Sequence, residues 1–391
     1  MHSTAVFPAA KIRASLTAAA LTLTLGACVS DGLDANRHQR DFLALASAPE
    51  SKSLRIPIFV ASTRRSDSGP GGDGRAHFSL VSISVPPDHR AGVIERASIG
   101  ANNARRDFTR MSRRNLDDVD FLDEIAAHVS GRAGPSRDIL LYVHGYDVSL
   151  DEARFRLAQI VADGSFSGVS ALFTWDSNSR SGLFAYESDK ESATVARDAL
   201  EKLILDLSHV PGVERVHILA HSMGAWLAME SMRAIAISGH PDLDGRLGEV
   251  MLAAPDIDLS VFAQQVSRVG PGHVSIFVSS TDRALLLSSH IAGDRPRLGA
   301  MDPSNPRDKA ELDALGVSVH DISRLNTDFM GHNTFAEVPA VVRQIGAQLA
   351  LPPQGDDNGQ AVIDLSGGDD ETSKDSRGSS AEAVETAPSG S

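Results

Sequence analysis

A serine flanked by small residues stands where a short apolar run meets a helical pattern. The pentapeptide is Ala220-His221-Ser222-Met223-Gly224, and the segment after it is apolar enough to form a helix that packs on a sheet. A small-x-Ser-x-Gly turn between a strand and a helix exposes the serine hydroxyl for nucleophilic attack. Gly224 permits strand and helix to approach closely, while Ala220 replaces the commoner first glycine. The same letters also fit a serine in an ordinary turn, so the assignment depends on partners elsewhere in the chain.

A serine hydroxyl is a poor nucleophile near neutral pH, so it needs a base to take its proton and an acid to orient that base. In hydrolases with a serine on such a turn, the acid and then a histidine follow along the chain. Asp282 comes directly after an apolar strand pattern and is the first candidate for the acid. Asp256 and Asp258, which follow the preceding strand, are alternatives, and Asp321 is a third. A carboxylate in such a position also commonly caps a helix.

His332 is the candidate base because it lies between the last predicted strand and the last predicted helix, after a glycine that permits an exposed turn. The chain has 14 histidines, so residue type alone says little. His320 is the best rival, but it lies inside a strand pattern, where packing is the expected role. His221 is too constrained by the turn to reach the adjacent hydroxyl as a base.

Backbone N–H groups at two places are suited to bind the oxyanion that forms when a serine attacks an acyl group, because preorganised dipoles stabilise developing charge best. The first is Met223, directly after the serine and at a helix N-terminus. The second is near Gly145 or Tyr146, which follow the first strand of the regular part of the chain. Aromatic residues near these loops are candidates for the mouth of an acyl pocket or for the core: Tyr146, Trp175 and Phe329.

From Asp138 onward, short β-rich runs alternate with longer amphipathic segments. This alternation predicts right-handed crossovers and a mostly parallel, doubly wound sheet with helices on both faces. Active sites of such sheets lie beyond the carboxyl ends of the strands, where all the candidates above fall. The predicted strands are 139–143, 170–175, 216–220, 249–254, 274–279 and 317–321. The predicted helices are 150–162, 187–208, 223–238, 260–269, 283–290 and 335–350.

The residues over 51–137 predict an extension of the same sheet, which precedes the core at 138–351. Strand-like runs at 56–61 and 77–85 are expected to be antiparallel, and a helix is expected at about 117–130. The glycine-rich stretch 69–74 formally fits a dinucleotide-binding motif. It precedes a strand rather than a helix, so a loop is predicted there.

The first 27 residues resemble a bacterial lipoprotein signal peptide. A positively charged start precedes an apolar stretch over 14–25, and Leu25-Gly26-Ala27-Cys28 matches a lipobox. The resemblance implies cleavage before Cys28 and lipidation of that residue. Cys28 is also the only cysteine, so no intrachain disulfide can form.

The resemblance predicts a protein held in the bacterial cell envelope by its lipidated Cys28, with a tether over 28–50 and the membrane as a partner. Val29 stands where an inner-membrane retention signal has aspartate, which favours the outer membrane. A plain secretory peptide with a chance cysteine, or an uncleaved anchor, are the alternatives.

Charge is distributed unevenly along the chain. The segment 352–391 has nine acidic and two basic residues and almost no large apolar ones, which predicts a disordered acidic tail. That tail accounts for half of the formal net charge of −14. The segment 52–114 has twelve basic and five acidic residues, as expected either for a solvated surface or for contact with anionic headgroups.

No metal, cofactor or nucleic acid is expected as a partner. The chain has no H-E-x-x-H helix and no paired cysteines for zinc, and its basic cluster lacks the interleaved aromatic residues of a nucleic-acid platform.

Several segments together resemble a bacterial α/β-hydrolase family of the esterase/lipase superfamily, whose members are described mainly by their fold. The resemblance covers about residues 55–350 and implies the α/β-hydrolase fold with a triad of Ser222, Asp282 and His332. It supplies no substrate, and the chain departs from many relatives in Ala220, the lipobox and the acidic tail. The segments that carry it are 141–146, 173–175, 191–193, 220–224, 253–258, 279–285 and 331–332.

The expected function is hydrolysis of a carboxylic ester or related acyl bond through an acyl-enzyme on Ser222, with a small-molecule or lipid-like ester as substrate. Two alternatives stay open. One is an envelope binding or structural protein that keeps the scaffold without turnover, since fold does not determine function. The other is an acyltransferase, in which an alcohol or amine replaces water.

Overall fold

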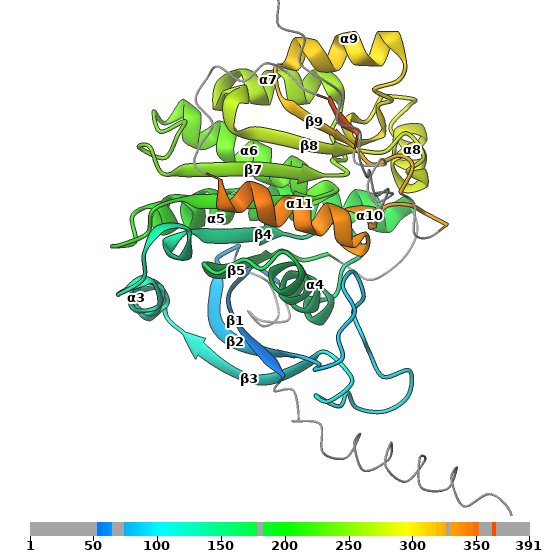
Figure 1. The fold of residues 1–391 in the computed structure, drawn as a ribbon. Helices are drawn as coiled ribbons and strands as arrows, with labels where there is room; N and C mark the ends of the chain where they lie inside the picture. The colour runs from blue at the N-terminus through cyan, green and yellow to red at the C-terminus, as the bar shows by residue number, and fades with distance from the viewer. Residues whose placement is uncertain (1–52, 65–73, 178–182, 326–328, 352–361, 365–391) are drawn as a thin grey trace, which may run out of the picture. The chain divides into compact units, whose positions relative to one another are not determined.

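The computed structural model describes residues 53–64, 74–177, 183–325, 329–351 and 362–364. The predicted signal peptide, the lipidation site Cys28 and the tether lie outside these ranges, as do nearly all of the glycine-rich loop and most of the acidic tail. The described residues form a ten-stranded sheet with helices on both faces (Figure 1).

Six neighbouring strands pair in parallel and form the centre of the sheet. The order across the sheet is β10-β9-β8-β7-β6-β4-β5-β1-β2-β3. Each central strand matches a strand predicted from the sequence to within two residues at either end, so these predictions are confirmed. The six are β4 (Ile139–Val143), β5 (Val169–Thr174), β6 (Val216–His221), β7 (Leu247–Ala253), β8 (Val274–Val278) and β9 (Ser318–Asp321).

The helices alternate with these strands as predicted, with one addition and one break. The addition is α9, which the sequence did not reveal because only Leu312 of this helix is buried and little apolar periodicity results. None of the described helices is both long and apolar enough to cross a bilayer. The helices are α3 (Asp118–Val129), α4 (Leu150–Asp163), α5 (Leu183–Ser208), α6 (Met223–Ile237), α7 (Leu259–Val269), α8 (Arg283–Ile291), α9 (Pro306–Leu315), α10 (Thr334–Glu337) and α11 (Pro339–Ala350).

The break divides the helix predicted over 335–350 into α10 and α11. Pro339 has no N–H to donate and is the first residue of α11, a position that proline favours. The short α10 follows directly on the loop that contains His332, so the break shapes the chain near the candidate base.

The sheet is buried on both faces. Along β4, Ile139, Leu141 and Val143 contribute to one apolar core, while Leu140 and Tyr142 contribute to the other. The first core lies under α3, α5, α6 and α7, and the second under α4 and α11. Burial on both sides explains why the strand reads as a continuous apolar run rather than an alternating one.

Three N-terminal strands extend the sheet, and two of them were predicted. β1 (Leu54–Ser62) and β2 (His77–Val85) are antiparallel to each other, and β1 joins β5 in parallel. The third, β3 (Thr109–Leu116), was not predicted because its side chains are mostly polar and exposed. It carries Arg110, Arg113 and Arg114 of the basic cluster on the edge of the sheet, where charged side chains discourage pairing with another chain.

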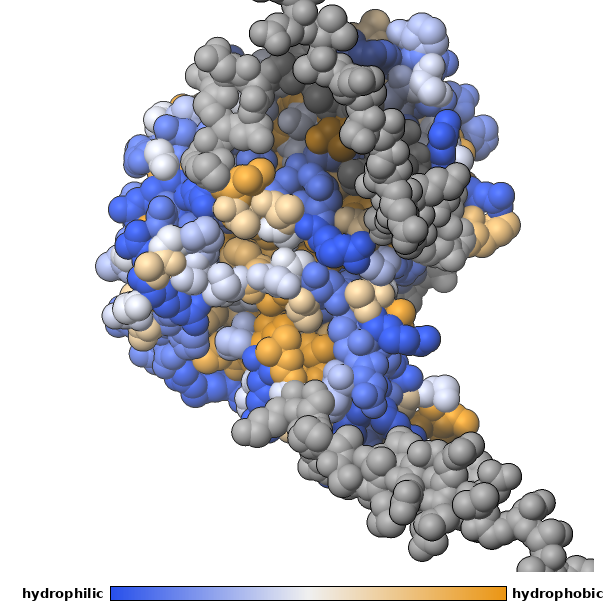
Figure 2. Space-filling model, viewed as in Figure 1, coloured by the Kyte–Doolittle hydropathy of each residue, from blue (hydrophilic) through white to orange (hydrophobic). Residues whose placement is uncertain are grey.

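The prediction that everything after Leu351 is disordered is wrong at one point. The strand β10 (Val362–Asp364) pairs in parallel with β9. Val362 and Ile363 are β-branched residues, which favour strands. The sequence did not indicate this strand because acidic and small residues surround the two positions. Figure 2 shows that the apolar surface on the viewed face is broken into separate patches among hydrophilic residues.

Two helices on one face of the sheet approach closely through glycine. A Cβ built on Gly346 of α11 would lie 2.1 Å from the carbonyl oxygen of Gly164, which ends α4. Because the obstacle is backbone, no side-chain rotation can relieve it. The contact holds α11, and with it the short α10, against α4.

We therefore expect Gly346→Ala to lower the free energy of unfolding by about 1–3 kcal/mol, the usual range for overpacking a core. The sign is informative, because glycine to alanine in an open helix stabilises a protein by up to about 1 kcal/mol. Urea denaturation followed by circular dichroism measures the change. A variant as stable as the wild type, or more stable, would show that the two helices do not meet in this way.

Candidate active site

Ser222 occupies the sharp turn between β6 and α6. Its backbone has φ 56° and ψ −124°, a left-handed conformation that a non-glycine residue adopts only when the surroundings enforce it. Its N–H donates to the carbonyl of Ala253 at 3.0 Å, and its own carbonyl accepts from the N–H of Asp256 at 3.2 Å. The neighbouring strand β7 and the loop that follows it therefore hold the serine in place.

Two glycines make room for this turn. A Cβ on Gly224 would lie 2.2 Å from the carbonyl oxygen of His144, so the start of α6 rests directly on the end of β4. A Cβ on Gly145 would lie 2.9 Å from Cβ of Ser222. The structure thus confirms that Gly224 must be small, and it places the loop of Gly145 and Tyr146 beside the serine. Met223 is the first residue of α6, where an N–H has no partner within the helix.

His332 is hydrogen-bonded to Asp282, the first candidate for the acid. The distance from Nδ1 to Oδ2 is 2.7 Å, and the Asp282 side chain is fully buried. Its other oxygen, Oδ1, accepts the N–H of Leu285 at 3.1 Å and caps α8. Asp282 is therefore a helix cap and a histidine partner at once. A proton on Nδ1 leaves Nε2 of His332 as the acceptor that a serine would need.

Ser222 and His332 line the same cavity, which has a volume of about 290 Å³. Within the described residues, no hydrogen bond joins the Ser222 hydroxyl to His332. Contacts between a nucleophile and its base commonly tighten only when substrate binds.

The wall of this apolar cavity comes from the loop after β4, from α5, from α8 and from the loop before His332. Apart from the serine and the histidine, it is mainly apolar, as expected for a site that receives a hydrocarbon chain. The residues that line it are Tyr146, Tyr186, Ser222, Asp256, Ala284, Leu285, Leu287, Ser288, Ile291, Met330 and His332.

His221 positions the loop of His332. Its Nε2 donates to the carbonyl oxygen of His332 at 3.1 Å, and its ring packs against those of His332 and Phe335. Burial lowers the pKa of His221 well below its ordinary value, so the ring is neutral. The sequence did not reveal this supporting contact, which occupies Nε2 of His221.

Arg64 fixes the loop after β4. Its Nη2 donates to the carbonyl oxygen of Val148 at 2.6 Å and to Nε2 of His144 at 3.2 Å. Nδ1 of His144 then donates to the carbonyl oxygen of Gly145 at 2.8 Å. Burial, and next the charge of Arg64, lower the pKa of His144 to about 3 and keep it neutral. A lone arginine at the end of β1 has no sequence signal that would have identified it.

Of the three aromatic residues considered for the mouth, only Tyr146 lines the cavity. Trp175 is fully buried, stacks on His144 and donates from Nε1 to the carbonyl oxygen of that residue at 2.9 Å. Phe329 is 77% exposed, with the guanidinium of Arg283 4.0 Å from its ring centre. The interpretation of Trp175 as a core residue is therefore the correct one.

The alternative acids have other partners. Asp256 accepts hydrogen bonds from Tyr186 at 2.8 Å and Ser288 at 2.6 Å and forms an ion pair with Arg297 at 3.2 Å. Asp258 caps α7. Neither is hydrogen-bonded to His332 in the described structure.

The remaining candidates for the acid and the base also have other hydrogen-bond partners. Asp321 accepts from the backbone and hydroxyl of Ser323. His320 is buried, stacks on Phe277 and is hydrogen-bonded to Gln348. The expectation that His320 packs within its strand is confirmed.

Tyr186 was not singled out from the sequence. It extends from α5 into the cavity wall, donates to Asp256 and meets the ring of Tyr146 edge-on at 5.7 Å between centres. Burial and the nearby Asp256 raise the pKa of its hydroxyl, so Tyr186 is a neutral hydrogen-bond donor. A tyrosine inside a helical pattern looks like any other core residue, which explains the omission.

Comparison with known proteins adds the family. A family model described as "Alpha/beta hydrolase of unknown function (DUF900)" matches residues 120–349. No curated protein matches the sequence.

Several solved structures are similar at low identity. A predicted CIB-like hydrolase from Thermoplasma acidophilum is 14% identical, covers 76% of this chain and 99% of its own, and has a TM-score of 0.34. The Pyrobaculum calidifontis esterase is 11% identical, with 80% and 90% covered and a TM-score of 0.33. Naproxen esterase (carboxylesterase NP) from Bacillus subtilis is 12% identical, with 80% and 95% covered and a TM-score of 0.27.

The site geometry predicts that Asp282→Asn lowers the reactivity of Ser222 by about 10³–10⁴-fold, because an amide in place of the carboxylate favours the wrong tautomer of His332. The rate of serine labelling by an activity-based phosphonate probe measures this. Asp117→Asn is the matched control, since asparagine retains the cap of α3 and this residue lines no part of the cavity, and it should change the rate by less than about threefold. Equal losses of labelling rate in both variants would show that Asp282 is not the acid that orients His332.

Proposed function

The chain belongs to the α/β-hydrolase family of unknown function, and on that premise we propose that it hydrolyses carboxylic esters through an acyl-enzyme on Ser222. The observation that carries the proposal is the buried Asp282–His332 hydrogen bond at the wall of the cavity that also contains the serine turn. A buried carboxylate on the far nitrogen of an imidazole orients that ring as a base. The tight turn holds the serine in a strained backbone conformation at the wall of the cavity, where a bound substrate would reach it.

The proposed reaction has two symmetrical halves. Nε2 of His332 takes the hydroxyl proton as Oγ of Ser222 bonds to the ester carbon, and the oxyanion is met by the N–H of Met223 and one from Gly145 or Tyr146. Collapse of this intermediate breaks the bond to the alcohol, which leaves with the proton from His332. Water then repeats the sequence on the acyl-enzyme and releases the carboxylic acid.

The cavity supports an acyl group of modest length. Its volume of about 290 Å³ corresponds to roughly ten non-hydrogen atoms at about 30 Å³ each. Side chains such as Leu285 and Ile291 offer dispersion contacts to a hydrocarbon chain but no charge to a polar one. We therefore propose short to medium acyl esters as the substrate class.

A fluorophosphonate probe tests the mechanism. We expect it to form one covalent adduct on Ser222, with loss of fluoride, and to abolish hydrolysis of a butanoate ester. Ser222→Ala should take up no probe and lose about 10⁴-fold or more in turnover. Ser192→Ala, at a half-buried serine on α5 that does not line the apolar cavity, is the control and should behave as wild type. Peptide mass spectrometry locates the adduct, and an adduct elsewhere, or none beside a labelled reference esterase, would refute the mechanism.

We also propose that lipidation of Cys28 anchors the protein in the bacterial cell envelope, with the outer membrane as the favoured site. The lipobox and the apolar stretch before it support this proposal. The proposal explains why a hydrolase would be found near lipid-like esters.

Metabolic labelling with an alkyne fatty acid tests the anchor in a bacterium that processes lipoproteins. The full chain should carry the label and sediment with the outer-membrane fraction in a density gradient. Cys28→Ser should lose both properties while the catalytic domain still reacts with the fluorophosphonate. Label that persists in Cys28→Ser would disprove acylation at this residue.

A further inference from the structure

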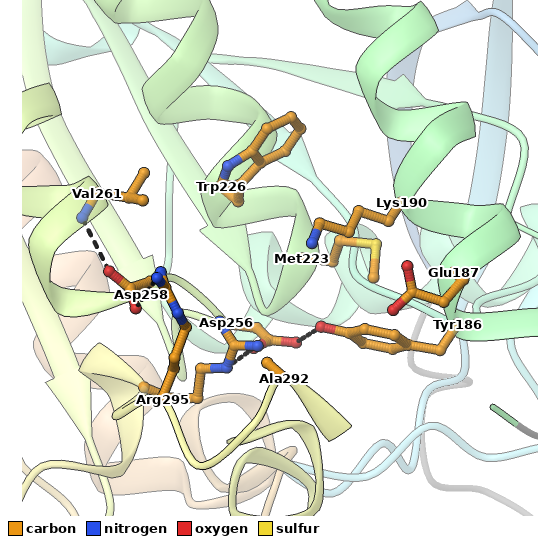
Figure 3. A pocket seen from close by; sticks show the side chains of 11 residues that line it. Tyr186, Glu187, Lys190, Met223, Trp226, Asp256, Asp258, Val261, Ala292 and Arg295 are labelled. Atoms are coloured by element: carbon orange, nitrogen blue, oxygen red, sulfur yellow. Dashed lines mark hydrogen bonds and ion pairs between the residues drawn. The ribbon is translucent and has the colours of Figure 1, made fainter. Parts of the chain in front are cut away.

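A second cavity of about 330 Å³ adjoins the apolar one. Tyr186 and Asp256 line both, and the hydrogen bond between them forms part of the common wall (Figure 3). Ser222 lines the apolar cavity, whereas the next residue, Met223, lines the second. An ester bound at Ser222 would therefore have an apolar space on one side and this second space on the other.

The second cavity differs in chemistry. Its side chains come from α5, α6, the segment after β7 and the segment after α8, and they converge on one space in Figure 3. The set contains three cations, three carboxylates and one indole: Lys190, Arg295, Arg297, Glu187, Asp256, Asp258 and Trp226.

The charges of this polar cavity balance. Arg297 pairs with Asp256 at 3.2 Å, and Arg295 with Asp258 at 3.3 Å. Glu187 and Lys190 add one charge of each sign, one turn apart on α5. An anion bound here would meet carboxylates, and a cation would meet guanidinium groups, each at an electrostatic cost. A neutral group with many hydroxyls fits better, because each hydroxyl both donates and accepts and can satisfy both kinds of partner.

Trp226 supplies the apolar surface that recognition of a polyhydroxylated group also requires. It lies on the first turn of α6, is partly buried against the core and leaves part of its indole in the polar cavity. An aromatic ring offers a flat apolar surface for the C–H face of a sugar, while the hydroxyls around that ring reach charged neighbours. The volume corresponds to roughly eleven non-hydrogen atoms at about 30 Å³ each, about the size of one hexose.

We propose that the polar cavity binds the alcohol half of the substrate and that this alcohol is a neutral sugar, so that the preferred substrate is a sugar carrying a short acyl ester. This inference rests on the proposed function and names its substrate class. The apolar cavity holds the acyl chain, Ser222 lies between the two spaces, and the released sugar departs through the polar cavity.

The test compares two butanoate esters of a primary alcohol on a six-membered ring, one polar and one apolar: a methyl glucoside acylated on its primary hydroxyl, and cyclohexylmethyl butanoate. We expect kcat/KM for the sugar ester to exceed that for the cyclohexyl ester by tenfold or more, after correction for their alkaline hydrolysis rates. Trp226→Leu and Lys190→Met should each lower this ratio about fivefold. Lys202→Met, an exposed lysine farther along α5, is the matched control and should leave the ratio unchanged.

Three results would overturn the sugar subsite. They are a ratio near one in the wild type, a ratio that neither variant alters, and a preference for the butanoate ester of the corresponding sugar phosphate, which would mark the polar cavity as an anion site. In each of these cases Ser222-dependent hydrolysis persists, so the proposed function stands.

A binding measurement decides the matter if no ester is hydrolysed. Tryptophan fluorescence of Ser222→Ala is titrated with the acylated glucoside, and the same protein with Trp226→Leu serves as the blank. Saturable quenching that requires Trp226 would support the subsite even if the proposed function failed, and its absence would refute the subsite.

Discussion

The carboxylate of Asp282 connects the parts of the site. It has no contact with solvent, and its two oxygens have separate tasks, since one caps α8 and the other holds Nδ1 of His332. The helix that it caps supplies Leu285 and Ile291 to the wall of the apolar cavity. One buried group therefore sets both the orientation of the candidate base and the start of the helix against which an acyl chain would lie. Partners on both oxygens offset the cost of burying this carboxylate.

The serine turn depends on a second constraint, which is steric. Gly224 brings α6 against the carbonyl of His144, and Gly145 brings the loop after β4 against Ser222. The candidate nucleophile and the candidate oxyanion donors therefore lie tightly packed together. Buried Arg64 ties that loop to the end of β1 through the neutral ring of His144. The N-terminal strands thus have a role beyond widening the sheet, because one of them delivers the cation that shapes the loop.

Much of the fold and of the candidate site could be predicted from the sequence, for identifiable reasons. The central strands are apolar on both faces, and the elbow, Asp282 and His332 each follow a strand, so local patterns were sufficient to propose them. β3 and α9 were not predicted because they bury few side chains and their apolar residues show weak periodicity. The last helix was predicted without its break at Pro339. The choice among the carboxylates was open in the sequence, because all of them follow strands and all of them suit helix caps.

The sequence by itself determined the order of the central strands and of most helices along the chain, the position of the serine turn and the chemical types that could serve it, because apolar periodicity and turn residues act over a few neighbouring positions. Only the tertiary structure decided that Asp282 meets His332, that Asp256 instead joins Tyr186 and Arg297, and that Tyr186 and Asp256 are shared by an apolar and a polar cavity. Those facts depend on distances between residues far apart in the chain, which packing sets and local sequence does not encode.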